Sequence, residues 1–266
     1  MSTYHSKKAK EFLKDPKKVE RHDRTFWSLR QKRDAAAAEL PEWEDLREHA
    51  SRIKEHTATH LVDYLEQFSN SLERNGVIVH FAKDAQEFNE MVYGILESHK
   101  VKKLVKSKSM LTEECEMNPY LIKRGINVVE SDLGERILQL MHLKPAHIVM
   151  PAIHLTRDEI GEMFEEKGIS KEKGNHDPTY LTRCAREDLR GDFMDADAGL
   201  TGCNFGVAAT GDCVVCTNEG NADMSTSVPK LHIVAMGIEK VIPDYDSLAV
   251  FQRLLARSGT GQPSTA

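Results

Sequence analysis

Short apolar runs alternate with amphipathic helical patterns through the middle of the chain, and this alternation constrains the fold more than any other feature. The apolar runs occupy residues 77–81, 103–105, 126–129 and 147–150. The helical patterns between and after them occupy residues 84–98, 112–123, 132–140 and 156–167. Strand–helix–strand repetition with these lengths indicates a parallel sheet that is covered by helices on both faces. We therefore predict an α/β fold.

Other elements flank this region. Apolar residues recur at three- and four-residue steps over 42–73, which predicts a long helix that ends at Asn75–Gly76. Asp132 before Glu135 and Thr156 before Glu159 are typical of helix starts. Later in the chain we predict a hairpin around Thr210–Gly211–Asp212, a strand, and two further helices. These elements span 178–193 (helix), 202–210 and 213–218 (hairpin), 231–236 (strand) and 246–256 (helix).

Charge is unevenly distributed along the chain. Residues 1–33 hold 11 Lys or Arg against 4 Asp or Glu, a net charge of +7, whereas the whole chain carries −6, which leaves −13 after residue 33. A basic arm on an acidic body suits nucleic acid, anionic lipid or an acidic partner. The alternative, which we favour, is that the arm lies on the chain's own acidic surface or on a sister subunit. We predict a basic helical arm at 1–40, an α/β domain at 41–257, a linker at 258–266, and no nucleic-acid partner.

The chain has no apolar stretch of about eighteen residues, so we predict no transmembrane segment. Its N-terminus lacks the apolar middle region of a secretory signal, and we expect a cytoplasmic protein. Five cysteines in a chain of this length predict reduced thiols. Cys213 and Cys216 form a C-x-x-C pair, but residues three apart on a strand point to opposite faces. We therefore predict buried thiols and no metal site.

Polar side chains follow the second predicted strand. Lys106, Ser107, Lys108 and Ser109 come just before a helix start, and ligands bind beyond the carboxyl ends of parallel strands. Ammonium groups, hydroxyls and free backbone N–H groups there suit a carboxylate or phosphate. The alternative is an ordinary solvated turn.

The next two loops add candidates at the same edge. Glu130, Ser131 and Asp132 follow the third predicted strand, and His154 follows the fourth. Glu130 is a candidate ligand-binding residue and His154 a candidate for proton transfer. The alternatives are that the two acids cap a helix and that His154 is structural.

The most unusual segment is Asn218–Glu219–Gly220–Asn221. A carboxylate held between two amides, where a glycine lets the backbone turn, could transfer protons or attack an acyl group. We therefore predict Glu219 as catalytic and Asn218 and Asn221 as ligand-binding. The alternative is an Asx-type turn with a surface glutamate.

Several of these segments carry a resemblance to a known family. They are 106–114, 130–135, 147–154, 218–221, 229–233 and 237–240. In this order, and over most of the chain from residue 20, they resemble the lactate utilization protein B family, the iron–sulfur members of three-protein lactate oxidation systems. No glycine-rich dinucleotide motif follows the first predicted strand, so a Rossmann-type nicotinamide site is not expected.

The resemblance implies a lactate-utilization (LUD) domain, with a fold of the NagB/RpiA/CoA-transferase-like type and an N-terminal helical extension. It implies a part in oxidising L-lactate to pyruvate, with sister subunits as partners, and it leaves room for a homo-oligomer. It also implies a ferredoxin-like region in the full-length protein with [4Fe–4S] clusters, whereas these five cysteines predict no cluster in the present fragment. The alternative is a module that binds a small anion, phosphate or CoA-type ligand, or docks subunits, without redox chemistry.

Overall fold

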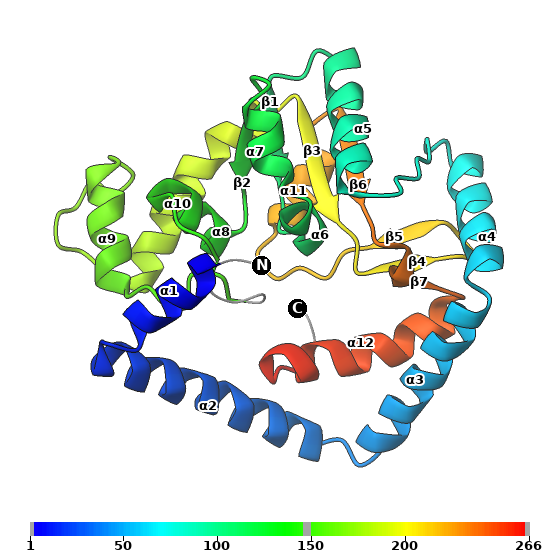
Figure 1. The fold of residues 1–266 in the computed structure, drawn as a ribbon, viewed down its shortest axis with the longest axis horizontal. Coiled ribbons are helices and arrows are strands. Elements are labelled where there is room, and N and C mark those ends of the chain that lie inside the picture. Colours follow the sequence, from blue (N-terminus) through cyan, green and yellow to red (C-terminus); the bar gives the residue numbers. More distant parts are fainter. Residues whose placement is uncertain (1–2, 146–149, 264–266) are drawn as a thin grey trace. The chain divides into compact units, whose positions relative to one another are not determined.

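The computed structural model describes residues 3–145 and 150–263 (Figure 1). The chain divides into two compact units. One is formed by the residues up to Ser51 together with those from Ala249 onward, and the other by Arg52–Leu248.

The larger unit contains a four-stranded sheet in which every strand is parallel to its neighbours. The strand order is β2-β1-β3-β6. The strands are β1 (Lys103–Lys106), β2 (Asn127–Glu130), β3 (Ala198–Gly202) and β6 (Leu231–Ala235). The predicted α/β fold with a parallel sheet is confirmed.

Helices cover both faces of this sheet. Leu104 and Val105 are neighbours in β1, so their side chains point to opposite faces, and both are fully buried. Leu104 packs with residues of α5 (Ala85–Ser98) and α7 (Met117–Ile122). Val105 packs with residues of α10 (Pro178–Met194), and Met224 of α11 (Asn221–Ser227) joins this cluster.

Two of the remaining helices of this unit, α8 and α9, begin where the sequence predicts. The side chain of Asp132 accepts a hydrogen bond from the backbone N–H of Glu135 at the start of α8. Thr156 and Glu159 form a capping box at the start of α9. The helices are α4 (Leu61–Arg74), α6 (Met110–Glu114), α8 (Leu133–Met141) and α9 (Arg157–Glu166).

A second, smaller sheet has the order β5-β4-β7. Strands β4 (Phe205–Val207) and β5 (Asp212–Val214) are antiparallel, which confirms the predicted hairpin. Strand β7 (Val241–Ile242) follows the short 3-10 helix η1 (Ile238–Lys240) and pairs with β4 in parallel.

Several predicted elements are wrong or shifted. Residues 77–81 form no strand: they follow Gly76, whose φ is +83°, and Ile78 is 81% exposed. Their apolar composition resembles a strand, but they pair with neither sheet. The long helix expected at 42–73 is broken at His60 into α3 (Trp43–Thr59) and α4. The helix expected at 112–123 is interrupted at Glu116, which has a left-handed φ of 51° and separates α6 from α7.

Two further differences concern strands. Strand β3 was not predicted, because its Ala-Gly-Leu-Thr-Gly composition is poor in β-branched residues. The strand predicted at 147–150 lies almost wholly outside the described residues.

The smaller unit is helical. Its first helices are α1 (Thr3–Phe12) and α2 (Pro16–Ala38), and the Asp15 side chain caps α2. The residues of the basic arm therefore lie mainly in these two helices. Helix α12 (Tyr245–Thr260) continues through 258–260, where we expected the linker to begin.

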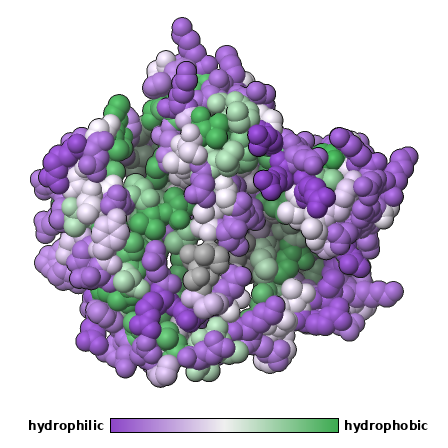
Figure 2. Space-filling view, turned by 180° about the vertical axis from the view of Figure 1, so that it is seen from behind, coloured by the Kyte–Doolittle hydropathy of each residue, from purple (hydrophilic) through white to green (hydrophobic). Residues whose placement is uncertain are grey.

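None of the helices in the described ranges is both long and apolar enough to cross a membrane. On the face drawn in Figure 2, hydrophilic residues prevail and hydrophobic ones show in patches between them.

Candidate functional site

A buried ammonium group lies at the carboxyl ends of two neighbouring strands. Lys106 ends β1 and is paired in register with Glu130, which ends β2. The Lys106 side chain is fully buried, and its Nζ atom lies 2.9 Å from Glu113 Oε1 and 3.0 Å from Glu130 Oε1. Nζ also donates a hydrogen bond of 3.2 Å to Thr112 Oγ1. The ammonium group of this lysine therefore contacts protein groups and not solvent.

Glu130 is held from several sides but keeps one oxygen without a hydrogen bond. Its Oε1 atom accepts from the side-chain amide of Asn118 as well as from Lys106. Its backbone N–H donates to Gln139 Oε1 at 3.2 Å. Its Oε2 atom is buried and has no hydrogen-bond partner among the described residues.

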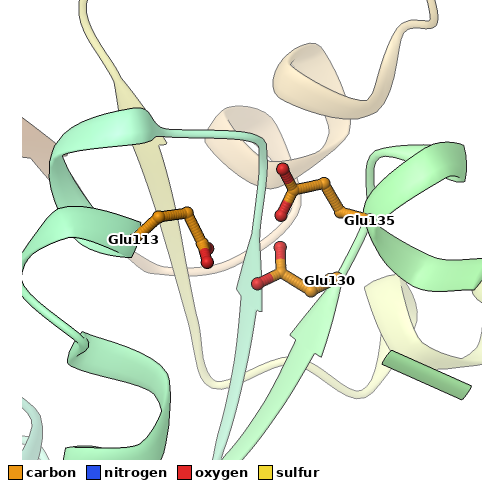
Figure 3. A group of neighbouring side chains, drawn as sticks. All are labelled: Glu113, Glu130 and Glu135. Carbon is orange, nitrogen blue, oxygen red and sulfur yellow. The ribbon is translucent and has the colours of Figure 1, made fainter. Parts of the chain in front are cut away.

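A third glutamate completes the cluster. Glu135 lies in the first turn of α8 and is 6% exposed. One carboxylate oxygen from each of Glu113, Glu130 and Glu135 lies within 4.8 Å of the others. Figure 3 shows the three carboxyl groups turned toward one another. We call Lys106, Glu113, Glu130 and Glu135 the Lys106 cluster.

Burial and mutual charge shift the pKa values in this cluster. Burial and, after it, the negative charge of Glu130 raise the pKa of Glu135 to about 7, against the opposing effect of Lys106. Burial also raises the pKa of Glu130, although Lys106 opposes this. For Lys106 burial by itself lowers the pKa, but Glu130 and Glu113 outweigh it and the net shift is upward. Lys106 therefore stays charged, whereas the upward shifts of the pKa values of Glu130 and Glu135 favour the protonated form of these two carboxyls.

Three clustered carboxylates are also a donor set for a divalent cation. In this cluster, however, the Lys106 ammonium is already within 3.0 Å of two of the carboxylates. The positive charge at their centre is thus supplied by the chain itself.

A second group of polar residues lies around Glu219. Its Oε2 atom accepts a hydrogen bond of 3.1 Å from the backbone N–H of Leu133, the first residue of α8. Glu219 is exposed as a residue, but partial burial of its carboxyl group raises its pKa and Asp132 adds to this, while the Leu133 N–H and the charge of Lys108 lower it. The turn that bears Glu219 therefore meets the loops that follow β1 and β2, and we call Lys108, Asp132, Leu133 and Glu219 the rim.

Gly220 lets the chain turn at this point. Its φ is +71°, a conformation that glycine adopts readily, and it precedes the first residue of α11. Asn221 is buried and its Oδ1 accepts from Thr217 Oγ1 at 3.1 Å, whereas Asn218 is exposed. The two asparagines therefore differ in their access to a ligand.

The serines of the loop after β1 are buried. Ser107 donates its backbone N–H to the Leu200 carbonyl at 2.9 Å, and its hydroxyl oxygen has no partner among the described residues. Ser109 caps α6. Their predicted ligand-binding roles, like that of Lys106, stay predictions.

His154 lies half-buried in the turn before α9. Its predicted role in proton transfer also stays a prediction. Glu113 and Glu135 were missed, because the sequence marks each only as an acid in the first turn of a helix. The available signal was their place on helices that begin right after strands whose last residues are Lys106 and Glu130.

The cysteines do not form a cluster site. Cys203 and Cys213 lie together: the Cys213 thiol and burial raise the pKa of Cys203, and the contact with Cys203 lowers the pKa of Cys213. Burial raises the pKa of Cys216. Among the described residues no three cysteines gather, whereas a [4Fe–4S] cluster needs four thiolates. These residues do not fit such a cluster.

Comparison with known proteins identifies relatives of this chain. The LUD domain family model matches residues 65–266. "Lactate utilization protein B" of Bacillus pumilus is 46% identical over 239 residues, which cover 90% of this chain and 50% of the relative. The proteins of the same name from an Exiguobacterium species and from Geobacillus kaustophilus are each 44% identical, over 90% and 86% of this chain and 50% and 48% of the relatives. The chain thus spans about half the length of these relatives. No solved structure matches it.

Proposed function

Because this chain belongs to the LUD domain family, we propose that it is the LUD part of an iron–sulfur component of a complex that oxidises L-lactate to pyruvate. The proposal takes the lactate-utilization role from the relatives' name. A fold of the NagB/RpiA/CoA-transferase-like type is part of the same proposal. The parallel sheet with its polar carboxyl edge is compatible with it.

The rim supports this proposal chemically. Lactate is a small carboxylate, and its oxidation releases two electrons and two protons. Lys108 supplies a positive charge for the carboxylate, and Glu219 supplies a base whose pKa is raised by the partial burial of its carboxyl group. The observation that carries the proposal is that Glu219 reaches the start of α8 beside Asp132, at the edge where parallel-sheet proteins bind ligands.

The electrons need an acceptor that these residues do not provide. We propose that [4Fe–4S] clusters in the remainder of the full-length protein accept them, together with sister subunits of the complex. In this proposal the LUD domain contacts the substrate, and the remainder of the full-length protein and the sister subunits transfer the electrons.

The test is lactate-dependent dye reduction by the full-length protein with its sister subunits. We expect Glu219→Gln to lower kcat by about 10²-fold, the usual contribution of a general base. Lys108→Ala should raise KM for lactate. Glu166→Gln, at an exposed position of α9, is the matched control and should leave the rate unchanged. Equal rates for Glu219→Gln and the unaltered protein would exclude Glu219 from the chemistry.

A second candidate function is anion binding without redox chemistry. It is favoured by the Glu219 carboxylate on the Leu133 N–H, since a helix start that holds one carboxylate could hold another anion. Calorimetric titration with L-lactate, inorganic phosphate and CoA separates the two functions. Binding of phosphate or CoA but not lactate would favour the anion-binding module, and binding of none would favour subunit docking.

A further inference from the structure

The Lys106 cluster contains a buried acceptor that lacks a donor. Glu130 is 3% exposed, and its Oε2 atom has no hydrogen-bond partner among the described residues. An acceptor left in this state carries the full cost of its removal from water, and this cost is larger when the acceptor is charged. A protonated carboxyl group could supply the missing donor, and an oxygen of Glu135 lies within 4.8 Å of an oxygen of Glu130. A proton on either carboxyl would turn two mutually repelling acceptors into a donor and an acceptor.

We propose that Glu130 and Glu135 hold one exchangeable proton between them, and that this pair exchanges it with a ligand hydroxyl at the rim. The shared proton concerns the present chain alone. Its exchange with a ligand rests on the proposed function. Neither role belongs to the residues that the sequence marked as catalytic.

The charges that surround the pair support a single proton. Glu135 on α8 is faced by Glu130 from β2, Lys106 from β1, Glu113 from α6 and Asp132 before α8. With every glutamate of the cluster ionised, three negative charges would surround one buried ammonium. One proton removes one of these charges, and the upward pKa shifts of both carboxyls agree with such sharing.

A proton explains the pair better than a divalent cation does. Lys106 Nζ lies 2.9 Å from Glu113 Oε1 and 3.0 Å from Glu130 Oε1. A metal ion bridging the same carboxylates would lie close to this ammonium and be repelled by it. A proton on Glu130 Oε2 or on the Glu135 carboxyl group leaves both ion pairs of Lys106 intact.

The pair and the rim are joined through one helical turn. Asp132 Oδ1 accepts from the Glu135 backbone N–H at 3.1 Å, and the next residue, Leu133, donates to Glu219 at 3.1 Å. Glu135 thus lies on the turn that Glu219 binds. The step we propose is a proton transfer only: the ionised pair accepts the proton of a hydroxyl group and later releases it to water, and no electrons move.

Infrared titration of the present chain tests the shared proton. We expect a protonated-carboxyl band at neutral pH that disappears as the pH rises, and that Glu135→Gln abolishes it. The glutamine amide can donate to Glu130 Oε2, so this variant should fold. Glu113→Gln is the matched control: it contacts Lys106 but leaves the pair in place, so the band should persist. Absence of the band in the unaltered chain, or its survival in Glu135→Gln, would overturn the shared proton.

Titration with Mn²⁺ tests the competing cation site. We expect no saturable binding that depends on Glu130 and Glu135. Stoichiometric binding that is lost in both Glu130→Gln and Glu135→Gln would overturn the proposal in favour of a metal site.

The pH profile of lactate-dependent dye reduction tests the exchange with a ligand. In the full-length protein with its sister subunits, Glu135→Gln should lower kcat by about 10²-fold and flatten the profile near neutral pH, with KM little changed. A profile identical to that of the unaltered protein would overturn the exchange while the infrared result stands. If Glu219→Gln loses lactate activity and Glu135→Gln does not, the exchange is wrong and the proposed function stands. If neither variant loses activity, the proposed function is wrong as well.

Discussion

Lys106 shows what a single buried charge does for this fold. Its ammonium is inaccessible to water and lies between Glu113 and Glu130. We predict that Lys106→Met destabilises the chain by about 3–5 kcal/mol, because both carboxylates lose their counter-charge while Glu130 stays buried. The loss should be larger at pH 8 than at pH 5, where the carboxyls can protonate. Urea unfolding measures it, and Lys123→Met, at an exposed position, should change stability by less than about 0.5 kcal/mol.

Glu135 should make stability depend on pH in an unusual direction. Its pKa is raised from 4.5 to about 7 in the folded chain, so the folded state binds the proton more tightly than the unfolded state. The stabilisation from the neutral form is complete below about pH 4.5 and is lost as the pH rises through about 7. The difference corresponds to on the order of 3 kcal/mol.

Glu135→Gln should remove this dependence, because glutamine does not ionise. Its stability relative to the unaltered chain should therefore rise between pH 5 and pH 8, as followed by chemical unfolding at each pH. Parallel curves for the two proteins would contradict the raised pKa.

The candidate site was predictable at residue level only in part. Lys106 and Glu130 follow from the rule that polar residues after parallel strands face a common edge, and the register pairs them. What the rule cannot supply is the direction of a side chain: the Lys106 ammonium lies against Glu113 and Glu130 inside the protein, and its predicted role in ligand binding stays a prediction. Glu135 escaped prediction because a glutamate at this helix position already has a capping explanation.

At the scale of elements, β3 and α11 approach each other closely through a glycine. A Cβ atom on Gly199 would lie 1.8 Å from the Ser225 carbonyl oxygen. We predict that Gly199→Ala costs about 1–3 kcal/mol or more, because a backbone atom must move rather than a flexible side chain. Gly191→Ala in α10 is the matched control: no atom lies within 4 Å of its Cβ, so it should stabilise the chain by about 0.5–1 kcal/mol. Thermal unfolding of both variants checks the contrast in sign.

Strands were predicted correctly where an apolar run is flanked by helices with recognisable N-caps. The strands at 103–106 and 127–130 are apolar runs that alternate with capped helices, and both were found within a residue or two. Residues 77–81 carry an equally apolar pattern yet form no strand, since pattern alone does not say whether a neighbouring strand is available. Strand β3 is the opposite case: it is a strand, but its sequence does not resemble one. Its glycines are required by close contacts that are known only from the fold.

At the scale of the whole molecule, the core of the α/β unit is assembled without the basic arm. The clusters of buried hydrophobic residues, with those packed against them, are drawn from residues 61–241. One of them joins Phe68 and Leu72 of α4 to Ala208 and Val241. The family match begins at residue 65, inside α4, so this boundary cuts through a cluster that the fold requires.

Two truncations should therefore behave differently. A chain that begins at residue 34 loses the basic part of the arm, residues 1–33, but keeps every cluster, and its main thermal transition should shift by less than about 3 °C. A chain that begins at residue 75 loses α4, and the exposed partners of Phe68 and Leu72 should lower the transition by at least about 10 °C, because each large core side chain contributes about 2–5 kcal/mol. Calorimetry with circular dichroism at each temperature separates the outcomes. A large shift for the first chain would mean that the basic arm is part of the α/β core rather than an addition to it.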